Sequence, residues 1–418
     1  PNKENNVFQL VVQYGAGERE FPKLGYAAQL MNNAGIMGAY EPQELKEELS
    51  KLNATCHVTA DDDNLYIIME GYEATLPQAC QLLSRQILMP KLDEKQLARL
   101  KGSAMGMRQQ RKDNVSILNE ALRQYMLYGE KSDYIKELTD KEIYELQISE
   151  LTGDINRASN YEAKVFFTGT LPFGQVYDIL SKNLPLVANE RPSNSPQAKD
   201  MMPVTENTVY FLPNNDAEQA QIHLYIPMQK ADKKDDVLRS AFNQYFGLDF
   251  TGIVLNEIRE KRSMAYTAYA FVGTQGIAGK ASYLRGYIGT QNDKANDALD
   301  VLMGLVNDMP KNPERIDNIK SYLRQAMLTS HPSFRNKAME LVDLGYRGYT
   351  DDPAKENLPK VDALTFDDIV KFYEENIKDK PYCISIMGNP KNIDLKRLEK
   401  FGKVVKLNER KLFNTKDA

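Results

Sequence analysis

The sequence is poor in the residues that carry most metal and nucleophile chemistry. Its 418 residues include only three histidines and three cysteines, and tryptophan is absent. Cys56, Cys80 and Cys383 are too few for a disulfide framework, and their spacing fits no zinc or redox motif. We expect small buried apolar residues at these positions, with a single Cys56–Cys80 bridge left open as an alternative.

The three histidines form no motif. His57, His223 and His331 lie far apart in the sequence, whereas H-E-x-x-H and H-x-x-E-H place two zinc ligands on one helical face. We therefore predict that none of the three binds a metal ion. A Ser-His-Asp or Cys-His nucleophile site is poorly supported for the same reason.

Long apolar runs and a strong excess of one charge are also missing. No stretch approaches the roughly 18 apolar residues that a membrane helix needs, so we expect no membrane segment. The 53 basic residues are outnumbered by 58 acidic ones, so no overall basic field attracts nucleic acid. The first residues lack a secretory signal pattern. The chain also begins with Pro1 instead of a methionine, which we interpret as a processed or trimmed piece of a longer product.

The sequence does contain an internal repeat. Apolar strand patterns that end in glycine recur in both halves, and so do capping-box signatures that begin with threonine. The matching positions are Gly71 and Gly289, Gly169 and Gly388, and Thr139 and Thr365. The offset is almost the same in the two glycine pairs and slightly longer in the threonine pair, and we interpret this near-constancy as a duplication.

We therefore predict an α+β fold of two tandem duplicated domains, each a largely antiparallel sheet with a helical layer on one face. The first domain is expected to cover residues 1–190 and the second residues 204–418. The polar stretch 189–203, rich in proline and serine, is typical of a linker. Alternation over 220–226 predicts a half-buried strand with His223 on its polar side.

Two further segments have plain structural explanations. Residues 273–280 fail the spacing of a phosphate-binding loop, so we predict a turn between strands. Arg108, Arg111 and Lys112 lie on a long predicted helix and have no aromatic neighbours that would stack on bases. We therefore predict a solvated helix face there.

One segment carries a more specific pattern. In residues 251–266, the apolar Val254, Leu255 and Ile258 define one face of a predicted helix, and basic residues crowd its last turn. Such residues complement the helix dipole, which is one explanation of the pattern. The stretch 257–266 also resembles the R-E-x-x-x-x-A-Y signature of the pitrilysin/insulinase family of zinc metallopeptidases, the inverted zincins.

This resemblance implies a function and two site residues. Members of that family enclose peptides between two halves of a clamshell, and each half consists of two α+β domains. One half holds zinc on H-x-x-E-H and a distant glutamate, and the other supplies an arginine and, seven residues later, a tyrosine. Arg259 and Tyr266 have this spacing and lie in the second copy. By the resemblance, Arg259 hydrogen-bonds substrate carbonyls, and Tyr266 donates to the developing oxyanion or a neighbouring carbonyl.

The zinc motif itself is degenerate here. Ala28 and Asn32 stand at the two histidine positions, Met31 stands at the general base, and the third ligand falls near Met107. Alanine and methionine do not bind Zn²⁺ usefully, and asparagine is a poor ligand. The resemblance therefore implies the non-zinc half of a metalloendopeptidase, without zinc and inactive alone. Its partner would be a zinc-bearing half, on the same precursor or as a separate subunit.

A catalytically inactive homologue that serves as a scaffold or peptide-binding subunit is the alternative. The retained Arg259 and Tyr266 favour the peptidase, since a scaffold needs neither. By analogy with the family, oligopeptides or unfolded segments are the expected substrates.

Overall fold

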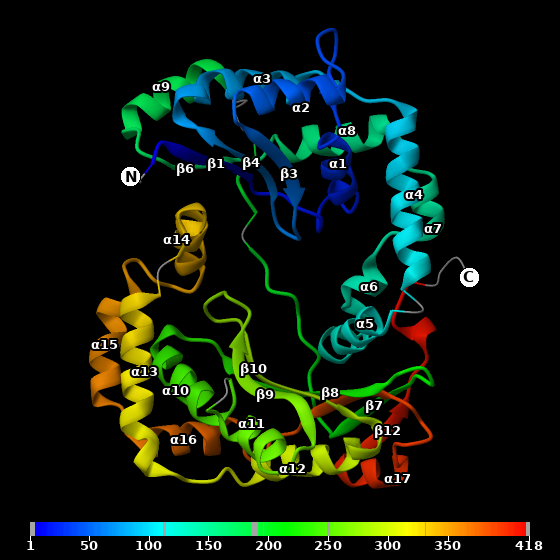
Figure 1. Cartoon of the computed structure of the whole chain (residues 1–418), viewed down its shortest axis with the longest axis vertical. Coiled ribbons are helices and arrows are strands. Elements are labelled where there is room, and N and C mark those ends of the chain that lie inside the picture. The colour runs from blue at the N-terminus through cyan, green and yellow to red at the C-terminus, as the bar shows by residue number, and fades with distance from the viewer. Residues whose placement is uncertain are drawn as a thin grey trace.

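Two sheets, each with its own helices, lie at opposite ends of the molecule (Figure 1). The figure shows a computed structural model, which describes residues 5–111, 114–184, 191–194, 196–248, 251–330 and 332–414. A long connection joins the two ends, and its described residues, 191–194 and 196–207, contain no helix. The predicted α+β fold is confirmed.

The first repeat is built on a four-stranded antiparallel sheet in the order β3-β4-β1-β6. Its strands are β1 (Val7–Tyr14), β3 (Thr55–Ala60), β4 (Leu65–Tyr72) and β6 (Ala163–Thr168). The other elements are α1 (Leu24–Met31), β2 (Gly35–Ile36), α2 (Pro42–Lys51), α3 (Leu76–Leu88), β5 (Pro90–Lys91), α4 (Glu94–Gln110), α6 (Asp133–Lys136), α7 (Asp140–Tyr144), α8 (Ile148–Ala158) and α9 (Phe173–Asn183). Alternate residues of β1, namely Phe8, Leu10 and Val12, are buried and form the first core with helical residues.

The second repeat has a six-stranded sheet in the order β12-β7-β11-β8-β10-β9. Its strands are β7 (Thr208–Pro213), β8 (Gln219–Lys230), β9 (Ala265–Thr274), β10 (Ala281–Gln291), β11 (Cys383–Gly388) and β12 (Lys403–Lys406). Its helices are α10 (Asp236–Phe246), α11 (Ile253–Leu255), α12 (Ala295–Asn307), α13 (Ile316–Thr329), α15 (Pro353–Ala363), α16 (Phe366–Asn376) and α17 (Leu395–Leu398). Ile222, Leu224 and Ile226 of β8 are buried in the second core.

The strand orders establish the duplication. Four strands of the second sheet, β9-β10-β8-β11, follow the same order and antiparallel pairing as β3-β4-β1-β6. The additional strands β7 and β12 pair in parallel, β7 with β11 and β12 with β7. Each repeat is thus a largely antiparallel sheet with a helical layer, as predicted.

One pair of positions used to detect the repeat corresponds differently in the structure. Thr139 and Thr365 both cap helices through the predicted capping boxes. However, α16 precedes β11 and contacts α10, and the helix that precedes β6 and contacts α1 is α8, not α7. Leu146 and Leu364, which precede α8 and α16, are separated by the same offset as Gly71 and Gly289. A capping box marks any helix start, and it matched α16 to the wrong helix.

Each repeat also sends one helix to the other sheet. These helices are α5 (Val115–Tyr128), which follows α4, and α14 (Lys337–Tyr346), which follows α13. Leu122 of α5 is buried together with Leu212 and Met387 of the second sheet. α14 stands between the two ends of the molecule and contacts β6 (Figure 1). Just before it, Arg335 pairs with Glu70 of β4 at 2.9 Å.

The crossing of α5 overturns the prediction of a half-buried strand at 220–226. His223 is only 2 % exposed, and its Nε2 lies 3.0 Å from Oδ1 of Asn119 on α5. Tyr225, two residues further along the same face of the strand, is 1 % exposed. The strand is therefore covered on both faces, because a helix distant in sequence packs on the face whose residues read as polar.

The predicted linker and domain boundaries stay a prediction. Residues 189–190 lie outside the described residues, and the described part of 191–203 contains no helix. Its backbone lies along the first repeat, where Asn194 N donates to Gly15 O at 2.9 Å and the Arg19 guanidinium donates to Gln197 O at 2.8 Å.

Two composition-based expectations concern thiols and membranes. Cys80 and Cys383 are buried free thiols, and Cys56 is a half-buried free thiol, so the alternative Cys56–Cys80 bridge is not formed. Among the described residues, no helix combines the length and apolar character needed to cross a bilayer.

Candidate functional site

Arg259 is presented by an irregular helical turn. After the short α11, residues Asn256–Glu260 form a π-helical turn in which Lys261 N donates to Asn256 O at 2.9 Å. Val254 and Ile258 are fully buried and anchor the turn, as the predicted apolar face requires. Single π turns often occur at functional sites. The Arg259 side chain is 34 % exposed.

The other basic residues of this turn have a separate partner. Glu257 Oε1 accepts from Lys261 Nζ at 2.6 Å, and Oε2 accepts from the Arg262 guanidinium at 2.5 Å. The hydrogen bonds from Lys261 and Arg262 lower the pKa of Glu257. Their charges are thus neutralised locally, whereas Arg259 approaches only Glu260, at 3.5 Å, among the described carboxylates.

A β-bulge in β9 changes the direction of the Tyr266 side chain. Along β10, Gly289 pairs with Thr267 but Thr290 pairs with Ala265, so Tyr266 is an extra residue in β9. Such a bulge turns a side chain out of the regular alternation, and Tyr266 is 76 % exposed although Ala265 and Ala268 are buried.

These two irregularities bring the predicted pair together. The Arg259 guanidinium carbon lies 5.1 Å from the centroid of the Tyr266 ring, which is the range of a cation–π contact. Both groups keep donors available to a ligand, five N–H of the guanidinium and one phenol O–H. The spacing of seven residues therefore reflects a real contact, and the role of Arg259 and Tyr266 toward substrate stays a prediction.

The positions of the degenerate zinc motif do not fit a zinc ion. Ala28 and Met31 are buried in the first core. The Asn32 amide is fully used by the neighbouring strand, because it donates to Val58 O at 2.8 Å and accepts from Val58 N at 2.7 Å. Met107 supplies only a thioether. Among the described residues, no cluster of three or more His, Cys, Asp or Glu side chains suits a metal ion.

The two described histidines lie in different repeats. His57 lies exposed on β3, and His223 is enclosed beneath α5, where burial and the charges of Arg285 and Arg123 lower its pKa well below 6.5. His331 lies outside the described residues.

The basic residues at the end of α4 are not a solvated face, contrary to prediction. The Arg108 side chain is 13 % exposed and that of Arg111 is 21 % exposed. Arg108 donates to Asp140 at 2.5 Å and to the backbone oxygen of Leu138, and Arg111 binds Glu137 with both terminal nitrogens. They fasten α4 to the segment around α7. Lys112 lies outside the described residues.

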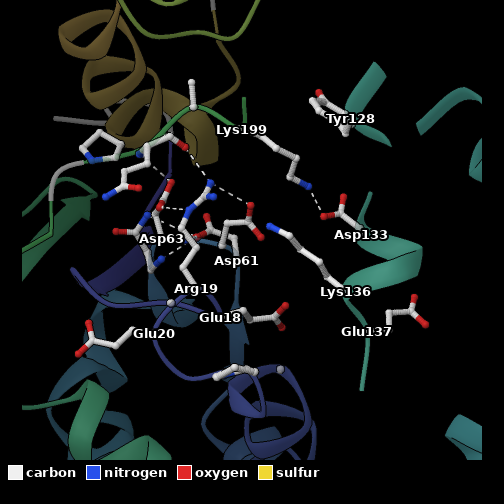
Figure 2. Close-up of a pocket in the computed structure, with 18 of the residues that line it drawn as sticks. Glu18, Arg19, Glu20, Asp61, Asp63, Tyr128, Asp133, Lys136, Glu137 and Lys199 are labelled. Carbon is white, nitrogen blue, oxygen red and sulfur yellow. Dashed lines mark hydrogen bonds and ion pairs between the residues drawn. The ribbon is translucent and has the colours of Figure 1, made fainter. Parts of the chain in front are cut away.

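A cavity of about 1870 Å³ lies between the two repeats. Its lining includes loops of the first repeat, α4, residues 194 and 196–199, and residues 275–277 of the turn between β9 and β10. That turn confirms the structural prediction for 273–280. In Figure 2, Glu18 and Asp61 face the cavity from the first repeat, while Asp133 and Glu137 approach from the opposite wall.

Ion pairs hold parts of this lining in place. Arg19 Nε donates to Asp63 at 2.8 Å, and Lys199 pairs with Asp133 (Figure 2). Glu18 forms no such ion pair with any residue that the structure describes. Burial, and then the charges of Asp62, Asp61, Asp133 and Glu137, raise its pKa to about 7. Sequence reasoning missed this cavity, because its residues come from separate loops and only the acidic run at 61–63 hints at it.

Comparisons with known proteins connect this geometry to a family. Residues 159–323 match the profile of the peptidase M16 inactive domain. No curated protein matches the sequence significantly. The chain is similar in structure to a peptidase M16 inactive domain from Pseudomonas fluorescens, with a TM-score of 0.73 and 16 % identity over 94 % of this chain and 95 % of that one.

Two larger proteases are similar over part of their length. The ferredoxin protease FusC, in complex with Arabidopsis ferredoxin, gives a TM-score of 0.73 and 12 % identity over 92 % of this chain and 42 % of FusC. The periplasmic protease PqqL of Escherichia coli gives 0.70 and 12 % over 92 % of this chain and 43 % of PqqL. Residues 159–323 thus match the inactive domain of peptidase family M16, and the predicted resemblance to the non-zinc half of the pitrilysin family is confirmed.

Proposed function

We propose that this chain is the non-zinc half of an M16-type metalloendopeptidase, which encloses a peptide and supplies Arg259 and Tyr266 to the active site of a zinc-bearing half. The observation that carries this proposal is the Arg259–Tyr266 contact at 5.1 Å. Both residues sit on local departures from regular structure that leave Arg259 partly exposed and Tyr266 largely exposed. Exposed donors held in a fixed relation suit the binding of carbonyl oxygens.

The extent of the chain supports a half-enzyme. It spans about two fifths of each larger protease that it resembles, FusC and PqqL. The inactive-domain match and the poor fit of Ala28, Met31, Asn32 and Met107 to zinc support a metal site in a partner half. A catalytically inactive scaffold or peptide-binding subunit is the second candidate, and the same match favours it.

A reassembly assay separates the two candidates. The chain is incubated with a quenched fluorescent peptide library and Zn²⁺, first alone and then with a separately produced half that carries H-x-x-E-H. No turnover alone and turnover on mixing would support the peptidase. Turnover by the chain alone that a chelator abolishes would contradict the proposal. No turnover in either case, with peptide binding retained, would favour the scaffold.

A further inference from the structure

One face of the second sheet is only partly covered. α5 packs over β11, β8 and β7. On β9 and β10, the side chains that alternate away from the second core are half-exposed instead of buried. We call this group the aromatic floor, and its members are Tyr269, Phe271, Tyr283, Arg285 and Tyr287.

The strand register brings these side chains side by side. Arg285 pairs directly with Phe271 on β9, and Tyr287 pairs with Tyr269. The ring centroids of Tyr269 and Tyr287 are 5.2 Å apart, and those of Tyr269 and Phe271 are 6.0 Å apart. Rings held by strands lose little entropy when they bind a ligand, which is why tyrosine-rich surfaces are effective in recognition.

At the centre of this floor, Arg285 has no counter-ion in the part of the chain that the structure describes. Its only hydrogen bond within the described residues runs from a terminal nitrogen to the Tyr269 hydroxyl at 3.5 Å, and its Nε is buried without a partner. Arg123 on the adjacent α5 differs, because its Nε donates to Glu120 at 2.7 Å. A half-buried guanidinium without an anion is costly to maintain unless a ligand completes it, and a carboxylate fits its planar donors.

We infer that the aromatic floor binds an extended peptide segment, in which an aspartate or glutamate side chain pairs with Arg285 and a neighbouring aromatic residue stacks on Tyr269 and Tyr287. The occupant follows from charge complementarity to Arg285. This inference rests on the proposed function for the peptide nature of the ligand, and it adds the class of segment that is selected. A lysine in place of the acidic residue is rejected by like charge.

Fluorescence anisotropy on the whole chain tests this inference without a zinc-bearing half. The probes are short fluorescein-labelled peptides, amidated at the C-terminus, with a central Glu-Phe or Gln-Phe pair. We expect the Glu-Phe peptide to bind roughly tenfold more tightly than the Gln-Phe peptide. In R285Q the two affinities should become equal, and in R285K the ratio should fall to roughly threefold, because the planar fork is lost.

Matched variants identify the source of any change. R324Q, which removes an exposed arginine on α13 that pairs with Asp362, should keep the full Glu/Gln ratio. Y287A should weaken both peptides by a similar factor and leave their ratio unchanged. A third probe, Gln-Phe with a free C-terminal carboxylate, should bind like its amide. Equal affinities of the wild-type chain for Glu-Phe and Gln-Phe, or a preference that follows the free C-terminus, would overturn the inference.

The proposed function fails in a different way. R259A should leave the Glu/Gln ratio unchanged, since Arg259 belongs to the other site. A persistent ratio without activation of any zinc-bearing half would remove the peptidase proposal and keep the aromatic floor. An absent ratio in a chain that activates such a half would remove only the aromatic floor.

Discussion

The two repeats share internal fastenings, which are hydrogen bonds between a side chain and the backbone of another element. They differ in the side chains that they expose at the candidate site. In both, an asparagine binds the edge strand of the sheet. Asn32, which caps the C-terminus of α1, binds both backbone groups of Val58, and Asn243 of α10 binds those of Val272 at 3.0 and 2.6 Å. Contacts that hold the architecture recur in both copies, whereas the π turn and the bulge described for the candidate site belong to the second copy.

A second fastening recurs at the offset predicted from the sequence. Glu73, after β4, accepts from the backbone N–H of Thr170 after β6. Asn292, after β10, accepts from the N–H of Asn389 after β11 at 2.8 Å. Both partners are shifted by the offset that separates Gly169 from Gly388. The accepting side chain is a carboxylate in the first repeat and an amide in the second, but the contact is the same. The fold therefore requires the hydrogen bond at this position and not a particular side-chain charge.

The sharpest test of this separation removes the exposed pair of the second repeat. R259A and Y266F should each lower kcat/KM of the reassembled enzyme by about 10²–10³, because donors to the developing oxyanion are lost, and should leave the unfolding midpoint unchanged. Steady-state kinetics and thermal unfolding measure the two effects. R324A is the control. A loss under about threefold for both variants would sink the site assignment.

The exchanged helices should respond unequally to truncation. Leu122 of α5 is fully buried, whereas Leu341 of α14 is 71 % exposed, and no residue of α14 is buried. L122A should lower the free energy of unfolding by about 3 kcal/mol through lost burial and a cavity, and L341A by less than about 0.5 kcal/mol. Urea unfolding measures both. Equal costs would mean that α14 docks as firmly as α5.

The two asparagine fastenings should cost similar amounts. N32A and N243A each leave a valine N–H and C=O without their partner, so we expect a loss of about 2 kcal/mol in each repeat. N33A is a matched control, because within the described residues the Asn33 side chain donates only to the backbone oxygen of the exposed Gln29 on α1. Unfolding in guanidinium chloride measures the loss of unfolding free energy in each variant. A large loss in only one of the two variants would contradict the equivalence of the two contacts.

The smallest expected effect concerns the pH dependence of stability, through the loops that precede α1 and α10. The pKa of Glu18 is raised to about 7 by burial and acidic neighbours, whereas that of Asp232 is lowered by the Lys234 backbone N–H. A raised carboxyl pKa means that the folded state binds more protons, so Glu18 reduces stability as pH rises from about 4.5 to 7.

E18Q should therefore be more stable than the wild type at pH 8, by about 1 kcal/mol after screening by cavity water, and equal to it at pH 4. Asp232 works in the opposite sense, since its lowered pKa favours folding above its unfolded value and that contribution is lost in acid. In D232N, the increase in the free energy of unfolding between acidic and neutral pH should be smaller than in the wild type. Melting temperatures across pH 4 to 8 test both, and an unchanged slope in E18Q would refute the assignment.

The sequence predicted local elements and their repetition well, and it failed where distant segments meet. The capping boxes at Thr139 and Thr365 begin helices, and strands end at or next to Gly169 and Gly388, as the local patterns predict. The Arg259–Tyr266 pair was found through a motif. The burial of His223, the ion pairs of Arg108 and the acidic cavity were missed, because each depends on a partner from a distant part of the sequence, which no local pattern records.

The crossing of α5 sets an order of events during synthesis. Chains emerge from the ribosome N-terminal end first, so α5 exists before any strand of the sheet that will cover its Leu122 and Met126. Until β8 and β11 have been synthesised, the apolar side of α5 is exposed to water. The dependence is unequal, since α14 buries nothing comparable when it reaches back. The nascent first repeat is therefore synthesised early but exposes an apolar surface that is prone to aggregation. We expect chaperone binding to this surface until residues 383–388, which form β11, have been synthesised.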